Sequence, residues 1–286
     1  MLNILIAVGF MAVLGLVLAT VLVIANRRLY VYEDPKIDLV EDMLPHANCG
    51  ACGTAGCRVF AEKLVTGESQ PGACTVNSAE MNQQIASFLG VELGSQEQRV
   101  ARLACAGGNN VARRHGDYQG VESCRAASLV SGGGKGCVWG CLGLGDCERV
   151  CDFDAIFMDA HDLPQVINDK CTACGDCVDI CPRDLFSLQP VSNKLWVACK
   201  NLEKGEAAEA ECAVACNGCG RCALDAPGNL IAIDHHLAVI DYTKNALASR
   251  IAIERCPTGA IVWLEDGVQK GHDAFKIIRK EPLPLQ

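Results

Sequence analysis

Twenty cysteines in a chain of 286 residues limit the folds open to this protein more than any other feature. Such a count indicates disulfides, structural metal or redox cofactors. Disulfide scaffolds are usually short secreted chains, whereas most of these cysteines are separated by only two or three residues, in C-x2-C and C-x3-C steps. Thiolates at that spacing suit chelation better than pairwise bridging. The sequence therefore predicts several cysteine-bound metal centres.

The first group of cysteines lies in a glycine-rich segment with the spacing C-x2-C-x4-C-x16-C. Its four predicted ligands are Cys49, Cys52, Cys57 and Cys74. Glycines let the backbone wrap closely around a cluster and point amide N–H groups at its sulfurs, so a 4Fe-4S cluster fits best. The alternative is a structural zinc site, which normally uses two C-x2-C pairs, whereas this segment has one.

The rest of the chain contains an internal repeat at an offset of 75 residues without a gap. The repeat aligns five cysteines of the first copy with five of the second: Cys124 with Cys199, Cys137 with Cys212, Cys141 with Cys216, Cys147 with Cys222, and Cys181 with Cys256. We interpret both copies as ferredoxin-like modules.

The first copy carries a run close to that of bacterial two-cluster ferredoxins, in which the fourth cysteine of each run ligates the cluster of the other run. This crosswise pattern predicts one set made of Cys151, Cys171, Cys174 and Cys177. The partner set contains Cys141, Cys147 and Cys181. Leu144 occupies the usual position of its remaining ligand, so we expect Cys137 to replace it, with Cys124 as the alternative.

The second copy has lost one site as a unit. The positions that match the first complete set hold Ala226, Ala246, Ser249 and Ala252. Cys256 remains, and crosswise ligation explains why, because it belongs to the other site. The surviving set is Cys216, Cys219, Cys222 and Cys256. The prediction is thus about four clusters with about sixteen iron atoms.

Four cysteines remain without a predicted role: Cys105, Cys124, Cys199 and Cys212. A stray ligand and a local pair are open for them, but we favour inert buried thiols. The formal charge of −9, without a basic stripe, argues against nucleic acid as a partner.

An apolar run without charge spans residues 4–25 and is about long enough to cross a bilayer. A cleaved signal peptide is the alternative, but no basic segment precedes the run, which is also longer than a usual signal core of about 7 to 15 residues. Arg27 and Arg28 follow, which predicts a single-pass anchor in the cell inner membrane with the bulk of the chain on the cytoplasmic side. A single helix without ionisable residues provides no ion pathway.

These features predict an α+β fold divided into six segments: residues 1–26 as a transmembrane anchor, 27–44 as a linker, 45–104 as an N-terminal 4Fe-4S domain, 105–190 as a two-cluster ferredoxin-like module, 191–266 as a degenerate module with one cluster, and 267–286 as a tail. Helical spacing of apolar residues extends from Ser78 to Arg102. Residues 231–233 and 260–263 are predicted to be short strands.

The order of these features resembles the B subunit of Rnf-type ferredoxin:NAD oxidoreductases over nearly the whole chain. The resemblance rests on the apolar helix, residues 48–57, residues 140–147 and the ferredoxin runs. The segments CRAA at 124–127, GKGC at 134–137 and LAVIDY at 237–242 are similar to the long form of that family. The lost site in the second copy departs from the family pattern, which puts the end of the electron path in doubt.

The resemblance implies an electron-transfer subunit that accepts electrons from reduced soluble ferredoxin and passes them to other subunits of an ion-translocating membrane complex. The resemblance also implies that NAD and flavin lie on those partners, and the sequence agrees, since no G-x-G-x-x-G follows a strand here. One alternative is a membrane-tethered polyferredoxin that serves another redox complex. A second is a zinc-stabilised scaffold, which would be colourless and silent in reduced-state EPR.

Overall fold

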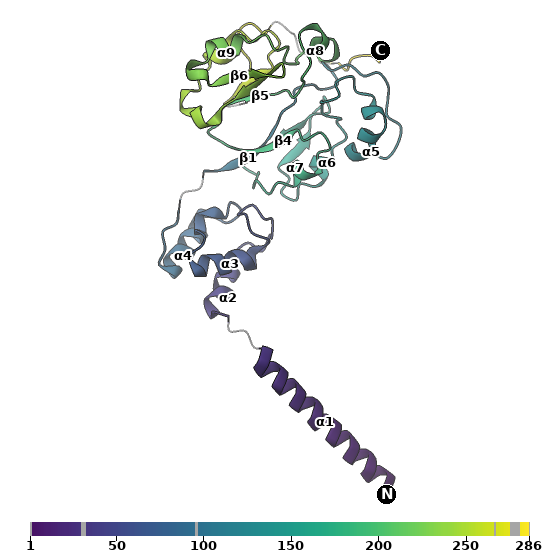
Figure 1. Ribbon diagram of the computed structural model, residues 1–286, viewed down its shortest axis with the longest axis vertical. Helices are drawn as coiled ribbons and strands as arrows, with labels where there is room; N and C mark the ends of the chain where they lie inside the picture. The colour runs from purple at the N-terminus through teal and green to yellow at the C-terminus, as the bar shows by residue number, and fades with distance from the viewer. Residues whose placement is uncertain (1, 30–32, 95–96, 266, 275–280, 286) are drawn as a thin grey trace.

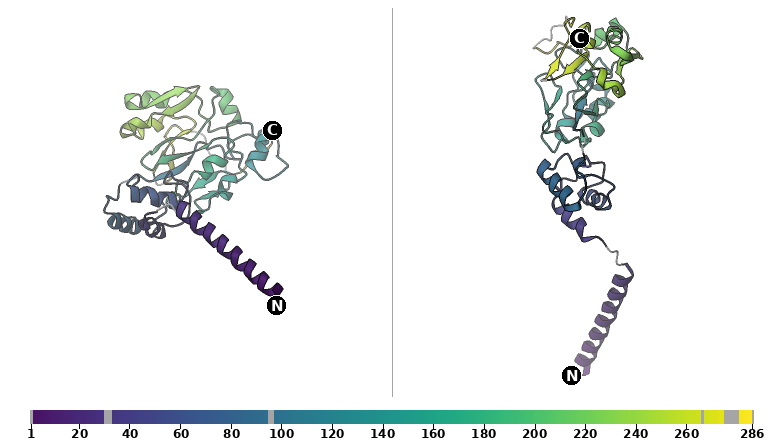
Figure 2. Two further views of the ribbon diagram at one scale, coloured as in Figure 1. Left: turned by 60° about the horizontal axis from the view of Figure 1, so that its bottom comes forward. Right: turned by 90° about the vertical axis from the view of Figure 1, so that its left-hand side faces the viewer.

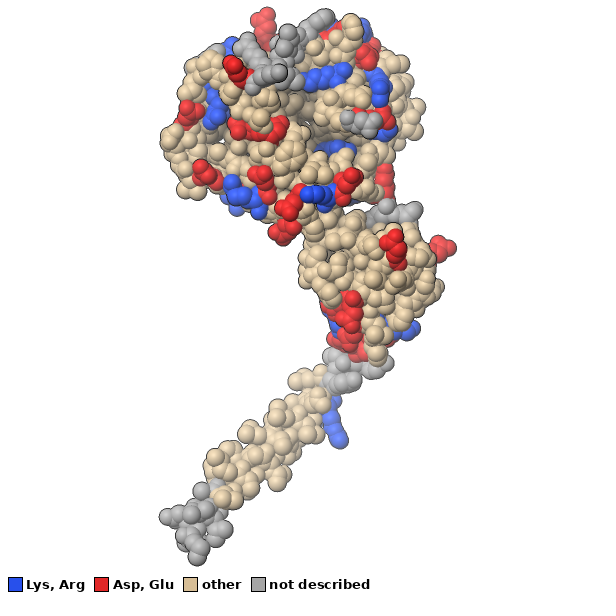
Figure 3. Space-filling view, turned by 180° about the vertical axis from the view of Figure 1, so that it is seen from behind, with Lys and Arg blue, Asp and Glu red and all other residues tan. Residues whose placement is uncertain are grey.

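The computed structural model describes residues 2–29, 33–94, 97–265, 267–274 and 281–285. Helix α1 (Leu2–Leu29) extends away from the rest of the chain (Figure 1). Its span Val8–Leu29 has a mean hydropathy of 2.7, is not buried against the protein, and is long and apolar enough to cross a membrane. Figure 3 shows charged side chains over the cysteine-rich part, whereas on the described part of α1 they occur only at its C-terminal end.

Three helices and one 3-10 turn form a small N-terminal unit: α2 (Pro35–Asp42), α3 (Cys57–Thr66), η1 (Pro71–Ala73) and α4 (Ala79–Leu89). The caps follow the sequence, since Asp34 accepts a hydrogen bond from Lys36 N and Ser78 accepts one from Met81 N. The core of the unit is apolar and consists mainly of Val40, Leu44, Phe60, Ala61, Leu64 and Ile85. These contacts join the helices around the first group of cysteines.

Helix α2 lies in the segment that we predicted to be a linker. Its apolar residues recur at helical spacing, so Val40 is fully buried against α3. Arg58 on α3 also forms ion pairs with Asp38 and Glu41. Residues 35–44 therefore pack with the N-terminal unit.

The helix predicted from Ser78 to Arg102 ends earlier than expected. Gly90 adopts a left-handed conformation and ends α4. Strand β1 (Arg99–Leu103) then pairs antiparallel with β4 (Phe186–Pro190), with Leu103 opposite Phe186. Pairing with a distant strand decides the conformation of β1, so this segment belongs to the following unit.

The chain after α4 consists of a first half, residues 99–190, and a second half, residues 195–269. Several elements of the first half recur in the second at the 75-residue offset. The first half contains α5 (Cys124–Leu129), η2 (Ser131–Gly134), α6 (Asp146–Arg149), β2 (Ile156–Met158), β3 (Pro164–Val166) and α7 (Asp176–Ile180), besides β1 and β4. The second contains β5 (Leu195–Val197), α8 (Glu206–Glu211), α9 (Arg221–Asp225), η3 (Pro227–Asn229), β6 (Ile231–Asp234), β7 (Leu237–Ile240), η4 (Tyr242–Leu247), α10 (Ile251–Glu254), β8 (Ile261–Leu264) and β9 (Val268–Gln269). Strands β6 and β8 confirm the two predicted strands, and the α+β class is confirmed.

The small sheets of the two halves are joined by side-chain contacts. β2 pairs with β3, β6 pairs with β7, and β8 lies between β5 and β9, all antiparallel. Trp196 on β5 donates through Nε1 to the carbonyl oxygen of Leu103 on β1 at 2.9 Å. Figure 2 shows the two halves adjacent in both further views.

An apolar core fills the position of the lost site in the second half. Ala226 and Ala252 are buried there with Leu230 and Ile253. These alanines occupy positions that hold cysteines in the first copy. Apolar side chains of the second half thus occupy the position that a set of four cysteines holds in the first half.

Removal of residues 1–32 should release the chain from membranes when it is produced alone. Because the span Val8–Leu29 is not buried against the rest of the protein, the iron content should stay unchanged. Ultracentrifugation without detergent, followed by iron analysis of both fractions, tests this expectation. As a control, a Gly9→Leu and Gly15→Leu variant keeps the helix apolar and should remain in the membrane, since a Cβ at either glycine meets nothing within 4 Å. A truncated chain that stays in the membrane would show that another segment binds it.

Candidate metal centres

The structure gathers the cysteines in five hollows, each lined by four of them. All twenty cysteines are free thiols. The volumes range from about 320 to about 380 Å³, so the hollows are similar in size. Four hollows correspond to the predicted sets, with one exchange of residues.

The N-terminal hollow is lined by all four predicted residues, Cys49, Cys52, Cys57 and Cys74. Cys57 is the first residue of α3, and its amide donates to Asn48 Oδ1 at 2.8 Å. Asn82 donates through Nδ2 to the carbonyl oxygen of Cys74 at 3.0 Å. Burial raises the pKa of Cys74, as do the neighbouring cysteines. The loop and α4 thus hold the four thiols around one space.

A second hollow is lined by Cys151, Cys171, Cys174 and Cys177, as the crosswise pattern predicts. Gly175 adopts a left-handed conformation before α7, whose second residue is Cys177. Ala101 N on β1 donates to Cys171 Sγ at 3.4 Å. Burial, together with the neighbouring thiols, raises the pKa of Cys177 to about 12.

The third hollow differs from our expectation, because Cys124 rather than Cys137 accompanies Cys141, Cys147 and Cys181. Asp146 explains this placement. Its buried carboxylate accepts hydrogen bonds from Ser123 Oγ at 3.0 Å and Arg125 N at 3.3 Å, which hold the start of α5 beside α6. Burial and then the neighbouring Cys124 and Cys181 raise the pKa of Cys147 to about 12.

Cys137 lies instead in a hollow with three of the cysteines that had no predicted role, Cys105, Cys199 and Cys212. Sequence reasoning missed this grouping because its members come from four separate segments. A signal was nevertheless present: once Cys124 joins the third set, the remaining cysteines number four.

The hollow of the second half is lined by the predicted residues Cys216, Cys219, Cys222 and Cys256. Gly220 precedes α9 in a left-handed conformation, and Cys222 is the second residue of that helix. Burial and then Cys216 and Cys256 raise the pKa of Cys222 to about 12. Cys256 thus lies with cysteines more than thirty residues earlier in the chain.

Clusters and single zinc ions require different spacings of the four thiols. A zinc site holds four sulfurs about 2.3 Å from one ion, so its thiols must meet more closely than thiols that each bind a different iron. Within the described ranges, no three Cys, His, Asp or Glu side chains form a group that could hold a metal ion. Backbone amides that donate to sulfur, such as Ala101 N, favour the thiolate form that a cluster requires.

Two family profiles match the chain at these sites. The FeS family, described as an Fe-S cluster, matches residues 44–76, and the Fer4 family, described as a 4Fe-4S binding domain, matches residues 164–186. The first range contains the N-terminal set, and the second contains the run from Cys171 to Cys181. Iron–sulfur binding domains therefore cover three of the hollows in part or whole, because Cys181 lines a different hollow from Cys171.

Full-length relatives extend the match to most of the chain. The chain is 40% identical to the B subunit of the Na⁺-translocating ferredoxin:NAD⁺ oxidoreductase complex of Acetobacterium woodii, over 91% of this chain and 78% of that protein. It is 38% identical to the proton-translocating counterpart of Clostridium ljungdahlii, over 90% and 91%. It is 37% identical to the B subunit of the ion-translocating oxidoreductase complex of Methanosarcina acetivorans, over 89% and 96%. The chain therefore belongs to the Rnf family of B subunits of ion-translocating oxidoreductase complexes.

Proposed function

We propose that this chain is a membrane-attached iron–sulfur electron-transfer subunit of an Rnf-type ion-translocating complex. The observation that carries the proposal is the gathering of cysteines from distant segments into hollows lined by four thiols each. The names of two relatives give ferredoxin and NAD⁺ as the redox pair of their complexes. Reduced soluble ferredoxin would be the electron donor, and other subunits of the complex would be the acceptors.

Four ligand sets for 4Fe-4S clusters follow from this proposal: Cys49, Cys52, Cys57 and Cys74; Cys151, Cys171, Cys174 and Cys177; Cys124, Cys141, Cys147 and Cys181; and Cys216, Cys219, Cys222 and Cys256. Each cluster, when bound, supplies one-electron transfer. The protein contributes thiolates, amide donors and burial, which tune the reduction potential. No acid–base residue is required for this chemistry.

Two tandem ferredoxin-like modules provide the framework of the proposed relay. Support comes from the recurrence of helices and strands at the 75-residue offset. The first module begins with β1 at Arg99, and the second ends near Leu264. The second module keeps one ligand set and an apolar core in place of the other.

Contacts between neighbouring sets support a continuous path from the N-terminal unit into the first module. Thr75, next to Cys74, donates through Oγ1 to the carbonyl oxygen of Thr172 at 2.7 Å. Thr172 follows Cys171, so this bond joins the loops of two ligand sets. Helix α7 carries Cys177 of the same set as Cys171, and α6 carries Cys147 of the neighbouring set. These two helices are also in contact.

The anchor supports a location at the membrane. Arg27 and Arg28 follow the apolar span, so we propose that the bulk of the chain lies on the cytoplasmic side. A reducing compartment would keep the thiols available for iron. A polyferredoxin of another redox complex has the same local chemistry, but the extended similarity to B subunits favours the Rnf-type complex.

Protein purified without oxygen should be brown and contain iron and sulfide, and the four sets above should account for about sixteen of its iron atoms. Reduced ferredoxin should bleach its visible absorbance, because the clusters accept electrons. Metal analysis and anaerobic spectrophotometry check both expectations. Zinc in place of iron would contradict the proposal, whereas iron that ferredoxin does not reduce would contradict only the proposed donor.

Double substitutions distinguish Cys124 from Cys137 as the partner of Cys141. Each single Cys→Ala change should remove about four iron atoms if the residue binds a cluster. Cys124→Ala with Cys141→Ala should lose no more iron than either alone, since both residues line one hollow. If Cys137→Ala with Cys141→Ala shows this non-additivity instead, the assignment of Cys124 is wrong.

Cys256→Ala should remove the cluster of Cys216, Cys219 and Cys222, although Cys256 lies far from them in sequence. The expected loss is about four iron atoms. Ala252→Ser is a matched control, because Ala252 is buried in the adjacent core without lining the hollow. Full iron in the Cys256 variant would exclude crosswise ligation.

A further inference from the structure

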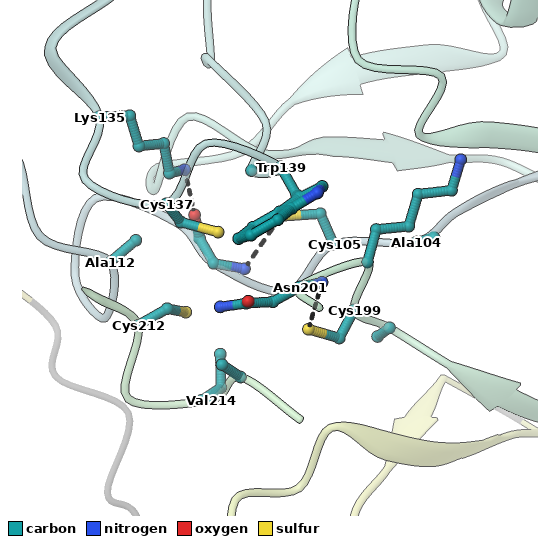
Figure 4. Close-up of a pocket in the computed structure, with 15 residues that line it drawn as sticks. Ala104, Cys105, Ala112, Lys135, Cys137, Trp139, Cys199, Asn201, Cys212 and Val214 are labelled. Carbon is teal, nitrogen blue, oxygen red and sulfur yellow. Dashed lines mark hydrogen bonds between the residues drawn. The ribbon is translucent and has the colours of Figure 1, made fainter. Parts of the chain in front are cut away.

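The hollow between the two C-terminal halves is lined by the four cysteines that the relay above does not use. Cys105 and Cys137 come from the first half, and Cys199 and Cys212 come from the second. Figure 4 shows these side chains converging from separate segments on one space. Its empty volume of about 320 Å³, open solvent included, is comparable to that of the N-terminal hollow. The same number of thiols therefore lines a hollow of similar overall size.

Glycine keeps room between two of the sulfurs. A Cβ at Gly107 would lie 3.0 Å from Cys212 Sγ, so even alanine would crowd that thiol, and it would also contact Cys105 Sγ at 3.6 Å. Gly107 N donates to Cys105 Sγ at 3.4 Å. Asn201 N donates to Cys199 Sγ, also at 3.4 Å. Amides directed at sulfur are a feature of iron–sulfur sites, where they favour thiolate.

Asn201 provides an independent indication of a ligand. Its side chain is only 1% exposed and lines the hollow. Glu203 N donates to Asn201 Oδ1 at 2.8 Å, which fixes the orientation of the amide. Among the residues that the structure describes, Asn201 Nδ2 has no hydrogen-bond partner, and Figure 4 shows the amide directed among the cysteines. A buried donor in this position calls for an acceptor within the hollow, and the sulfur atoms of a cluster would provide one.

We propose that Cys105, Cys137, Cys199 and Cys212 bind a fifth 4Fe-4S cluster that bridges the two ferredoxin-like halves. This inference rests on the proposed function, because it extends the same relay. It replaces our expectation of inert thiols at Cys105, Cys199 and Cys212.

Backbone contacts place this cluster site between two of the others. Cys141 N donates to Cys105 Sγ at 3.5 Å, and Cys216 N donates to Cys199 Sγ at 3.3 Å. Cys141 and Cys216 line the neighbouring hollows of the first and second halves. One electron that leaves either neighbouring cluster would reduce the fifth cluster by one electron, and its passage to the opposite neighbour would reoxidise it.

Lys135 provides positive charge beside the site. Cys137 and Cys212 are buried, so negative charge gathered in this hollow needs compensation from the protein. Lys135 lines the hollow and donates through Nζ to the carbonyl oxygen of Gly107. A cation at this position would also offset the negative charge of a thiolate-bound cluster.

The first test is the iron content of full-length protein purified without oxygen. Cys105→Ala and Cys199→Ala should each remove about four iron atoms, and the double variant should lose no more than either single variant. Ala208→Ser is a matched control, because Ala208 is buried in the core next to Cys212 but lines none of the five hollows, so the iron content should stay unchanged. Undiminished iron in both cysteine variants would overturn the fifth site and leave the proposed function intact. Unsubstituted protein without iron would overturn both.

A second test does not remove a ligand. Asn201→Leu should keep the full iron content but lower the midpoint potential of one cluster, because a hydrogen bond to sulfur stabilises the reduced, more negative state. Asn193→Leu, at another buried asparagine that lines none of the five hollows, should leave all potentials unchanged. Redox titration monitored by EPR measures both variants. Unchanged potentials in the Asn201 variant would contradict the assigned role of its amide.

Discussion

The structure depends on one constraint: four thiols must meet around a space large enough for a cluster, in surroundings that tolerate negative charge. The chain meets this constraint with short helices and strands and with backbone amides that donate hydrogen bonds to cysteine sulfurs. Gly145, Gly175 and Gly220 adopt left-handed conformations that begin the short helices carrying Cys147, Cys177 and Cys222. A side chain at such a glycine would be strained whatever the space around it. The glycine-rich composition follows from this geometry.

Cysteine hollows and apolar packing substitute for one another in the two halves. In the first half, a hollow lined by four cysteines occupies the position that Ala226 and Ala252 fill in the second half with Leu230 and Ile253. Bound clusters contribute to folding where present, because a metal site that forms only in the folded state adds its binding free energy to stability. The second half instead gains stability from apolar burial. Its fold is thus kept although one set of four cysteines is absent.

The arrangement between the halves is not part of either repeat alone. Strands β1 and β4 pair within the first half, and Trp196 on β5 connects them to the second. This junction brings Cys105 and Cys137 to Cys199 and Cys212. If these residues bind a cluster, the loss of one site in the second half would shorten the relay at its far end without interrupting it.

The sequence by itself determined the apolar anchor, the α+β class, the strands β6 and β8, and three groupings of cysteines that the structure also brings together. These features follow from local periodicity and from a repeat whose ligation pattern is crosswise. The tertiary structure decided what depends on long-range contacts: the pairing of β1 with β4, the place of α2 in a core, and the exchange of Cys137 for Cys124. Buried Asp146 holds α5 beside α6, and no spacing rule encodes that contact.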